Sequence, residues 1–133
     1  MPFFEASQAS IAYEQVGEGP DIVWVSGGGD AGDSWDTYQI PHFRRAFRNT
    51  TFTNRGVGPT TCRQPVPWTI ADMARDTAEL IRAVCAPPQF GREVVDLCPT
   101  ATYHLFEGMG HCSIYGHEHE RLNAEIEAIV RTP

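Results

Sequence analysis

Polar and apolar residues alternate near the start of the chain, and this pattern predicts β-strands. Ser10–Val16 alternates in this way and is closed by a turn rich in glycine and proline. Asp21–Ser26 contains a continuous apolar run, which is typical of a central parallel strand covered on both faces. Asn49–Thr53 and Ala101–Phe106 show the same character and predict two further strands.

The segment after the second of these strands predicts a helix. Asp33 or Ser34 can cap it, and aromatic residues recur along it as far as Phe47. Pro41 falls inside this segment and removes a backbone donor. We therefore expect the helix to be kinked or split in two.

The clearest helix lies between Thr69 and Val84. Thr69 is a good N-cap residue and an aspartate follows in the first turn. Apolar residues recur at helical spacing, so we expect the charged residues to face water, namely Asp72, Arg75, Asp76 and Glu79. A short helix over Gln89–Leu97 and a C-terminal helix over Glu118–Arg131 complete the pattern.

Strands that alternate with helices at these lengths predict an α/β fold. We expect a minimal, mostly parallel sheet of about four strands with flanking helices. The chain has 133 residues, which fits one domain spanning residues 1–133.

Composition and charge narrow the possible partners and compartments. A hydrophobic content of 41% with 20% charged residues is ordinary for a soluble globular protein. A formal net charge of −7 argues against nucleic acid and anionic membranes as partners. We find neither a signal-peptide pattern nor a membrane-spanning apolar run. The four cysteines form no close-set pair, which favours reduced thiols in a cytoplasmic protein over a disulfide framework or a zinc site.

Two glycine-rich turns carry the candidate chemistry. Gly27, Gly28 and Gly29 follow a predicted strand, and their backbone N–H groups could stabilise a developing oxyanion or hold a phosphate. Gly108-Met109-Gly110-His111 follows another predicted strand and leads towards the last helix. An imidazole side chain ordinarily titrates near neutrality, so His111 is a candidate general base.

These turns, together with Asn54-Arg55-Gly56-Val57-Gly58, resemble the α/β-hydrolase family. The resemblance covers nearly the whole chain from Ile11, with three motifs in the family's order. Ser26 stands where the family customarily has a histidine before the glycines, and Thr53 replaces an aspartate. The Gly-x-Ser-x-Gly nucleophile elbow is absent from the sequence, as is the block that would carry the cap and the triad aspartate.

The resemblance suggests how a site could be reassembled without that block. Residues 101–106 would move into the vacant position beside the strand that ends at Ser26, which would bring Ser26 opposite His111. Ser26 would then act as nucleophile, His111 as base and Asp30 as the group that orients the imidazole. Alternatives remain open: Ser113 or Cys112 as nucleophile, Asp33 or Glu107 as orienting group, and Ser26 merely bonding the loop backbone.

The function implied is hydrolysis of small esters of the carboxylesterase type, with monoanionic phosphodiesters as a second substrate class. We expect no cofactor and no metal, because the spacing of His117 and His119 matches no known metal motif. The relocated strand would leave an exposed edge, which predicts a homodimer. The alternative is a non-catalytic dimeric module that keeps the α/β-hydrolase scaffold.

Overall fold

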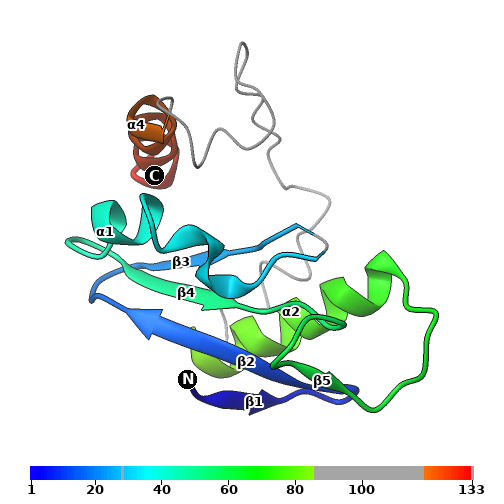
Figure 1. Cartoon of the computed structure of the whole chain (residues 1–133). Helices are drawn as coiled ribbons and strands as arrows, with labels where there is room; N and C mark the ends of the chain where they lie inside the picture. The colour runs from blue at the N-terminus through cyan, green and yellow to red at the C-terminus, as the bar shows by residue number, and fades with distance from the viewer. Residues whose placement is uncertain (28, 86–118, 133) are drawn as a thin grey trace.

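The computed structural model describes residues 1–27, 29–85 and 119–132, and its central feature is a five-stranded sheet with helices on both faces (Figure 1). The elements in chain order are β1 (Phe3–Glu5), β2 (Ala9–Val16), β3 (Asp21–Trp24), the 3-10 helix η1 (Gly32–Trp35), α1 (Gln39–Phe43), β4 (Arg48–Phe52), β5 (Thr61–Cys62), α2 (Ile70–Val84) and α4 (His119–Val130).

The order of the strands is β1-β2-β4-β3, with β5 paired to β2. Only β3 and β4 run parallel among these pairs, because η1 and α1 carry the chain back between them. The β1–β2, β2–β4 and β2–β5 pairs are antiparallel. The predicted α/β class with flanking helices is confirmed, but the sheet in the described residues is mixed rather than mostly parallel. The connection between β1 and β2 is too short for a parallel crossover.

Two hydrophobic clusters hold the layers together, one on each face of the sheet. On one face, Leu80 of α2 packs with Ile11 and Phe52. On the other face, Trp24 packs with Phe43 of α1, and Ile126 of α4 lies against this cluster. Val23 of β3 packs against the first cluster and Trp24 belongs to the second, so β3 contributes to both faces, as its continuous apolar run predicted. In the described part of the chain its one strand neighbour is β4, and the predicted strand over residues 101–106 lies outside that part.

β4 is a buried strand made largely of polar residues. Asn49 and Thr50 are at most 1% exposed. The Asn49 amide oxygen accepts from the Trp24 indole N–H at 2.9 Å, and the Thr50 hydroxyl accepts from the Gln15 amide at 3.0 Å. Buried polar groups are tolerated when they are hydrogen-bonded, so this strand can occupy the middle of the sheet.

The helix predicted from Thr69 to Val84 is present as α2, with the expected cap. The Thr69 hydroxyl accepts from the Asp72 backbone N–H, and the Asp72 carboxylate accepts from the Thr69 backbone N–H at 2.8 Å. The expected solvent face is wrong at two positions, since Asp72 and Asp76 are buried whereas Ile70 is 79% exposed. The cap fixes the first aspartate, and an ion pair with Arg55 draws the second inward.

The predicted helix after β3 is split, as Pro41 suggested, into η1 and α1. The expected cap by Asp33 or Ser34 is wrong: the N-cap residue of η1 is Ala31, which has no side-chain cap. The hydroxyl of Thr53 instead accepts the backbone N–H of Gly32 at 3.0 Å. The residue that follows β4 thus satisfies a donor at the start of this helix.

The C-terminal helix is confirmed as α4 and packs beside α1 (Figure 1). The amide of Gln39 donates to Asn123 at 3.2 Å, and His119 stacks on Tyr38 with ring centroids 3.9 Å apart. The predicted helix over residues 89–97 lies outside the described part. Among the helices that are described, none combines the length and apolar character needed to cross a membrane.

Candidate functional site at the ends of β3 and β4

The glycine loop after β3 is held in place by Asn54, which follows β4. The Asn54 side-chain amide donates to the carbonyl oxygen of Ser26 at 2.8 Å and lies 3.4 Å from that of Gly27. Asn54 is only 6% exposed, so these bonds are shielded from water. The amide bridges the ends of the two parallel strands and fixes the direction in which the loop leaves the sheet.

The hydroxyl of Ser26 ties the same loop to η1. Its oxygen accepts from the Trp35 indole N–H at 2.9 Å, and its O–H donates to the Ala31 carbonyl at 3.2 Å. The hydroxyl of Ser34 lies 3.3 Å away, and Ser26 as a whole is 7% exposed. This pattern is that of a serine that holds a loop, which was the alternative interpretation of Ser26. A nucleophile at this position would have to give up the bond to Ala31.

The described glycines of the loop are open to solvent and sharply turned. Gly27 and Gly29 are both exposed, and Gly29 has a φ of 95°, in the region that favours glycine. The backbone N–H of Asp30 donates to the Gly27 carbonyl at 3.3 Å. The Asp30 carboxylate lies 3.6 Å from the position that a Cβ would take at Gly27. Its negative charge favours neutral over dianionic ligands at the loop.

The predicted partner of Ser26 cannot be placed. His111 and Gly28 lie outside the described residues, as do the alternative nucleophiles Cys112 and Ser113 and the alternative orienting residue Glu107. The proximity of Ser26 and His111, and the role of Asp30 beside the imidazole, therefore stay predictions. Asp33, the other orienting candidate, lies in the first turn of η1.

Sequence reasoning missed the ion pair that supports the loop after β4. The Arg55 guanidinium donates to both carboxylate oxygens of Asp76 at 2.7 and 2.8 Å, and both side chains are at most 4% exposed. These hydrogen bonds raise the pKa of Arg55, which keeps it charged. The spacing of Asp72 and Asp76 was an available signal for a shared polar face on α2, because residues four apart lie on the same face of a helix.

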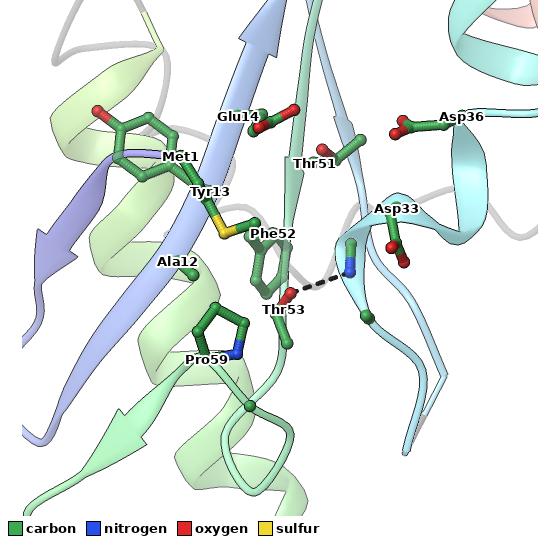
Figure 2. A pocket seen from close by; sticks show the side chains of 13 residues that line it. Met1, Ala12, Tyr13, Glu14, Asp33, Asp36, Thr51, Phe52, Thr53 and Pro59 are labelled. Atoms are coloured by element: carbon green, nitrogen blue, oxygen red, sulfur yellow. Dashed lines mark hydrogen bonds between the residues drawn. The ribbon is translucent and has the colours of Figure 1, made fainter.

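A cavity of about 210 Å³ lies beside this site, between η1, β2 and β4 (Figure 2). Glu14, Asp33 and Asp36 line it together with Thr51, and Ala12 and Pro59 form part of its apolar wall. Gly32 and Thr53, which the hydrogen bond joins, both line this cavity. Over the described residues, no group of three or more His, Cys, Asp and Glu side chains could hold a metal ion.

This chain is similar to known proteins over part of their length. The protein BpoC of Mycobacterium tuberculosis, named as a candidate non-heme bromoperoxidase, is 38% identical over 80 residues, which cover 59% of this chain and 30% of BpoC. The crystal structure of a hydrolase from Pseudomonas aeruginosa matches with a TM-score of 0.57 at 31% identity, over 62% of this chain and 32% of that one. The described part of the chain has the fold of the α/β-hydrolases, and the chain is similar to members of that family.

The structure of Rv0554 of Mycobacterium tuberculosis matches this chain with a TM-score of 0.51 at 36% identity, over 56% of this chain and 27% of that one. No protein-family model matches the chain. The chain spans about 30% of the length of the curated relatives that it matches. In open α/β sheets, ligands bind beyond the carboxyl ends of the strands. The loop at Gly27 and the Asn54 amide lie at those ends of the parallel strands β3 and β4.

Proposed function

We propose that this chain hydrolyses small, uncharged esters at the glycine loop after β3, with monoanionic phosphodiesters as a second substrate class. The observation that carries the proposal is the anchoring of the loop by Asn54 and Ser26. Preorganised backbone donors are the usual means of stabilising an oxyanion. The name of the Pseudomonas aeruginosa neighbour, a hydrolase, agrees with this reaction class.

The proposed catalytic residues are Ser26, His111 and Asp30. The Ser26 hydroxyl would attack the ester carbonyl carbon while its proton passes to His111, and the loop N–H groups would stabilise the resulting oxyanion. The protonated imidazole would return the proton to the departing alkoxide, and water activated by His111 would then cleave the acyl-enzyme. The first step requires the Ser26 hydroxyl to exchange the Ala31 carbonyl for the imidazole.

The decisive experiment is labelling with a fluorophosphonate probe followed by mass mapping, combined with rates on p-nitrophenyl acetate. The proposal predicts a label on Ser26 and large losses of kcat in Ser26→Ala and His111→Ala. Ser34→Ala is the matched control, because it removes a hydroxyl from the same cluster and is expected to keep the label. Full activity in both Ser26→Ala and His111→Ala would overturn the catalytic pair. A label on Ser113 or Cys112 would move the nucleophile to that residue.

A second candidate function is a non-catalytic dimeric module. The fully bonded and buried hydroxyl of Ser26 favours it, since the residue then needs no role beyond holding the loop. This function predicts an inert wild-type protein that sediments as a homodimer in analytical ultracentrifugation. An active monomer at the same concentration would exclude it.

A further inference from the structure

Three carboxylates line the cavity between η1, β2 and β4 (Figure 2). Glu14 lies on β2, Asp33 lies in η1, and Asp36 ends that helix. In the described part of the chain, none of these three side chains has an ion pair or a hydrogen bond. By contrast, the carboxylates of Asp21 and Asp76 are each paired with an arginine.

A second, independent feature of this cavity is the side chain of Thr51. Thr51 is only 7% exposed and lines the cavity between Glu14 and Asp36 (Figure 2). Its hydroxyl has no hydrogen-bond partner among the described residues, whereas those of Thr50, Thr53 and Thr60 are all bonded. This oxygen is not among the fully enclosed ones, because Thr51 lines the cavity, and it is therefore free to bond a molecule that enters.

The electrostatics of the cavity point to a positively charged ligand. Burial raises the pKa of Asp36, and the negative charges of Glu14 and Asp33 raise it further. Among the described residues that line the cavity, no side chain is basic and so none offsets this repulsion. A cation that entered would relieve it and would be attracted by all three carboxylates.

We propose that this cavity is a binding site for a small organic cation that carries an ammonium or guanidinium group. Glu14, Asp33 and Asp36 supply the countercharge, and the Thr51 hydroxyl accepts a hydrogen bond from the charged group. The alkyl part of the ligand lies against the apolar wall at Ala12 and Pro59. A directly ligated metal ion does not fit, because the described side chains form no metal-binding group. The site is separate from the proposed esterase chemistry.

The test is calorimetric titration of the full chain with n-butylammonium and n-butylguanidinium, with n-butanol and butyrate as the uncharged and anionic controls. We expect the two cations to bind, with affinity that weakens at high salt, and the controls not to bind. Asp36→Asn and Glu14→Gln should each weaken binding about fivefold, as for one partly screened charge. Thr51→Val should weaken it as well. Glu18→Gln is the matched control, because Glu18 is an exposed carboxylate outside the cavity.

Backbone amide chemical shifts of the wild-type protein keep the test decisive if a variant unfolds. Bound n-butylammonium should shift the amides of Thr51 and Asp36 and leave that of Glu18 unchanged. The proposal is overturned if neither cation binds, if Glu18→Gln weakens binding as much as Asp36→Asn, or if Mg²⁺ binds where the amines do not. Loss of ester hydrolysis would leave this result intact, since the described catalytic residues of the proposal, Ser26 and Asp30, do not line the cavity.

Discussion

The guanidinium of Arg55 and the carboxylate of Asp76 form a buried, doubly hydrogen-bonded ion pair between the loop after β4 and helix α2. The two hydrogen bonds measure 2.7 and 2.8 Å. The guanidinium also donates to the Gln64 side chain at 3.0 Å. The Trp68 ring lies beside it, with the ring centroid 5.9 Å from the guanidinium carbon. The pair joins the loop that follows β4 to the helix that covers the sheet, so it determines where that loop lies.

We expect Asp76→Ala to lower the free energy of unfolding by about 3–5 kcal/mol, because it leaves the Arg55 charge buried without its partner. Chemical denaturation followed by circular dichroism would measure the change. Glu125→Ala is the control, because it breaks the exposed Arg121–Glu125 pair of α4 and should cost less than about 0.5 kcal/mol. Similar losses in the two variants would contradict a special role for the buried pair.

Asp72 should make the stability of the protein depend on pH in the acid range. The backbone N–H and hydroxyl of Thr69 lower the pKa of Asp72 from 3.8 to about 2. Because the pKa is lower in the folded state, the ionised carboxylate stabilises the fold above pH 3.8, and this contribution disappears as the pH falls towards 2.

The comparison of wild type with Asp72→Asn checks this expectation. The difference in free energy of unfolding should be constant above about pH 5 and should shrink between about pH 4 and pH 2. Thr69→Ala should cost about 1 kcal/mol at neutral pH through loss of the cap. It should keep much of the pH dependence, because the backbone N–H of residue 69 remains. A difference between wild type and Asp72→Asn that stays constant down to pH 2 would refute the assignment.

Two glycines with similar backbone angles should respond differently to substitution. Gly29 has a φ of 95°, and a Cβ placed there meets no atom within 4 Å. Gly56 has a φ of 84°, but its Cβ would lie 2.6 Å from the Trp68 ring. Gly29→Ala should therefore cost about 1–2 kcal/mol from the backbone alone. Gly56→Ala should cost more, because a steric clash is added.

A double-mutant cycle separates the two causes at Gly56. Trp68→Leu removes the far part of the ring that a Cβ at residue 56 would strike. The penalty of Gly56→Ala should consequently be smaller in the Trp68→Leu background, and that of Gly29→Ala should be unchanged there. An equal penalty for Gly56→Ala in both backgrounds would mean that the backbone angle alone sets its cost.

Local patterns predicted the elements well where the evidence lay within a short stretch. The cap at Thr69 and the strand at Ser10–Val16 depend on neighbouring residues, and both were recovered. β1 and β5 were missed because strands of three and two residues carry too little periodicity to detect. Asp76 was placed on the solvent face because its partner lies 21 positions earlier in the chain.

In the candidate site, too, local features were predicted and contacts between distant residues were not. The glycine loop and the Asn54 motif were found from residue type and order, and the structure brings them together through the bond from Asn54 to Ser26. The surroundings of Ser26 were not predictable, because Trp35 and Ala31 reach its hydroxyl only after η1 folds back over the loop. Likewise, nothing in the sequence indicated that Thr53 would satisfy Gly32.

The Asn54 amide should control the order of the glycine loop more than the stability of the fold as a whole. Asn54→Ala removes the donor to the buried Ser26 carbonyl and should cost about 1–3 kcal/mol. Asn54→Asp should cost more above the carboxylate's pKa, since it places a negative charge against two carbonyl oxygens.

Asn123→Ala provides the matched control for this prediction. Asn123 is also buried and accepts a hydrogen bond from Gln39, but it lies on α4, away from the loop. Hydrogen exchange at the amides of Gly27 and Gly29 is the measurement that distinguishes the two variants. Asn54→Ala should accelerate exchange at these amides beyond what the loss of global stability explains, whereas Asn123→Ala should not. Equal acceleration in both would show that Asn54 contributes only to overall stability and that the loop is ordered by its contacts with η1.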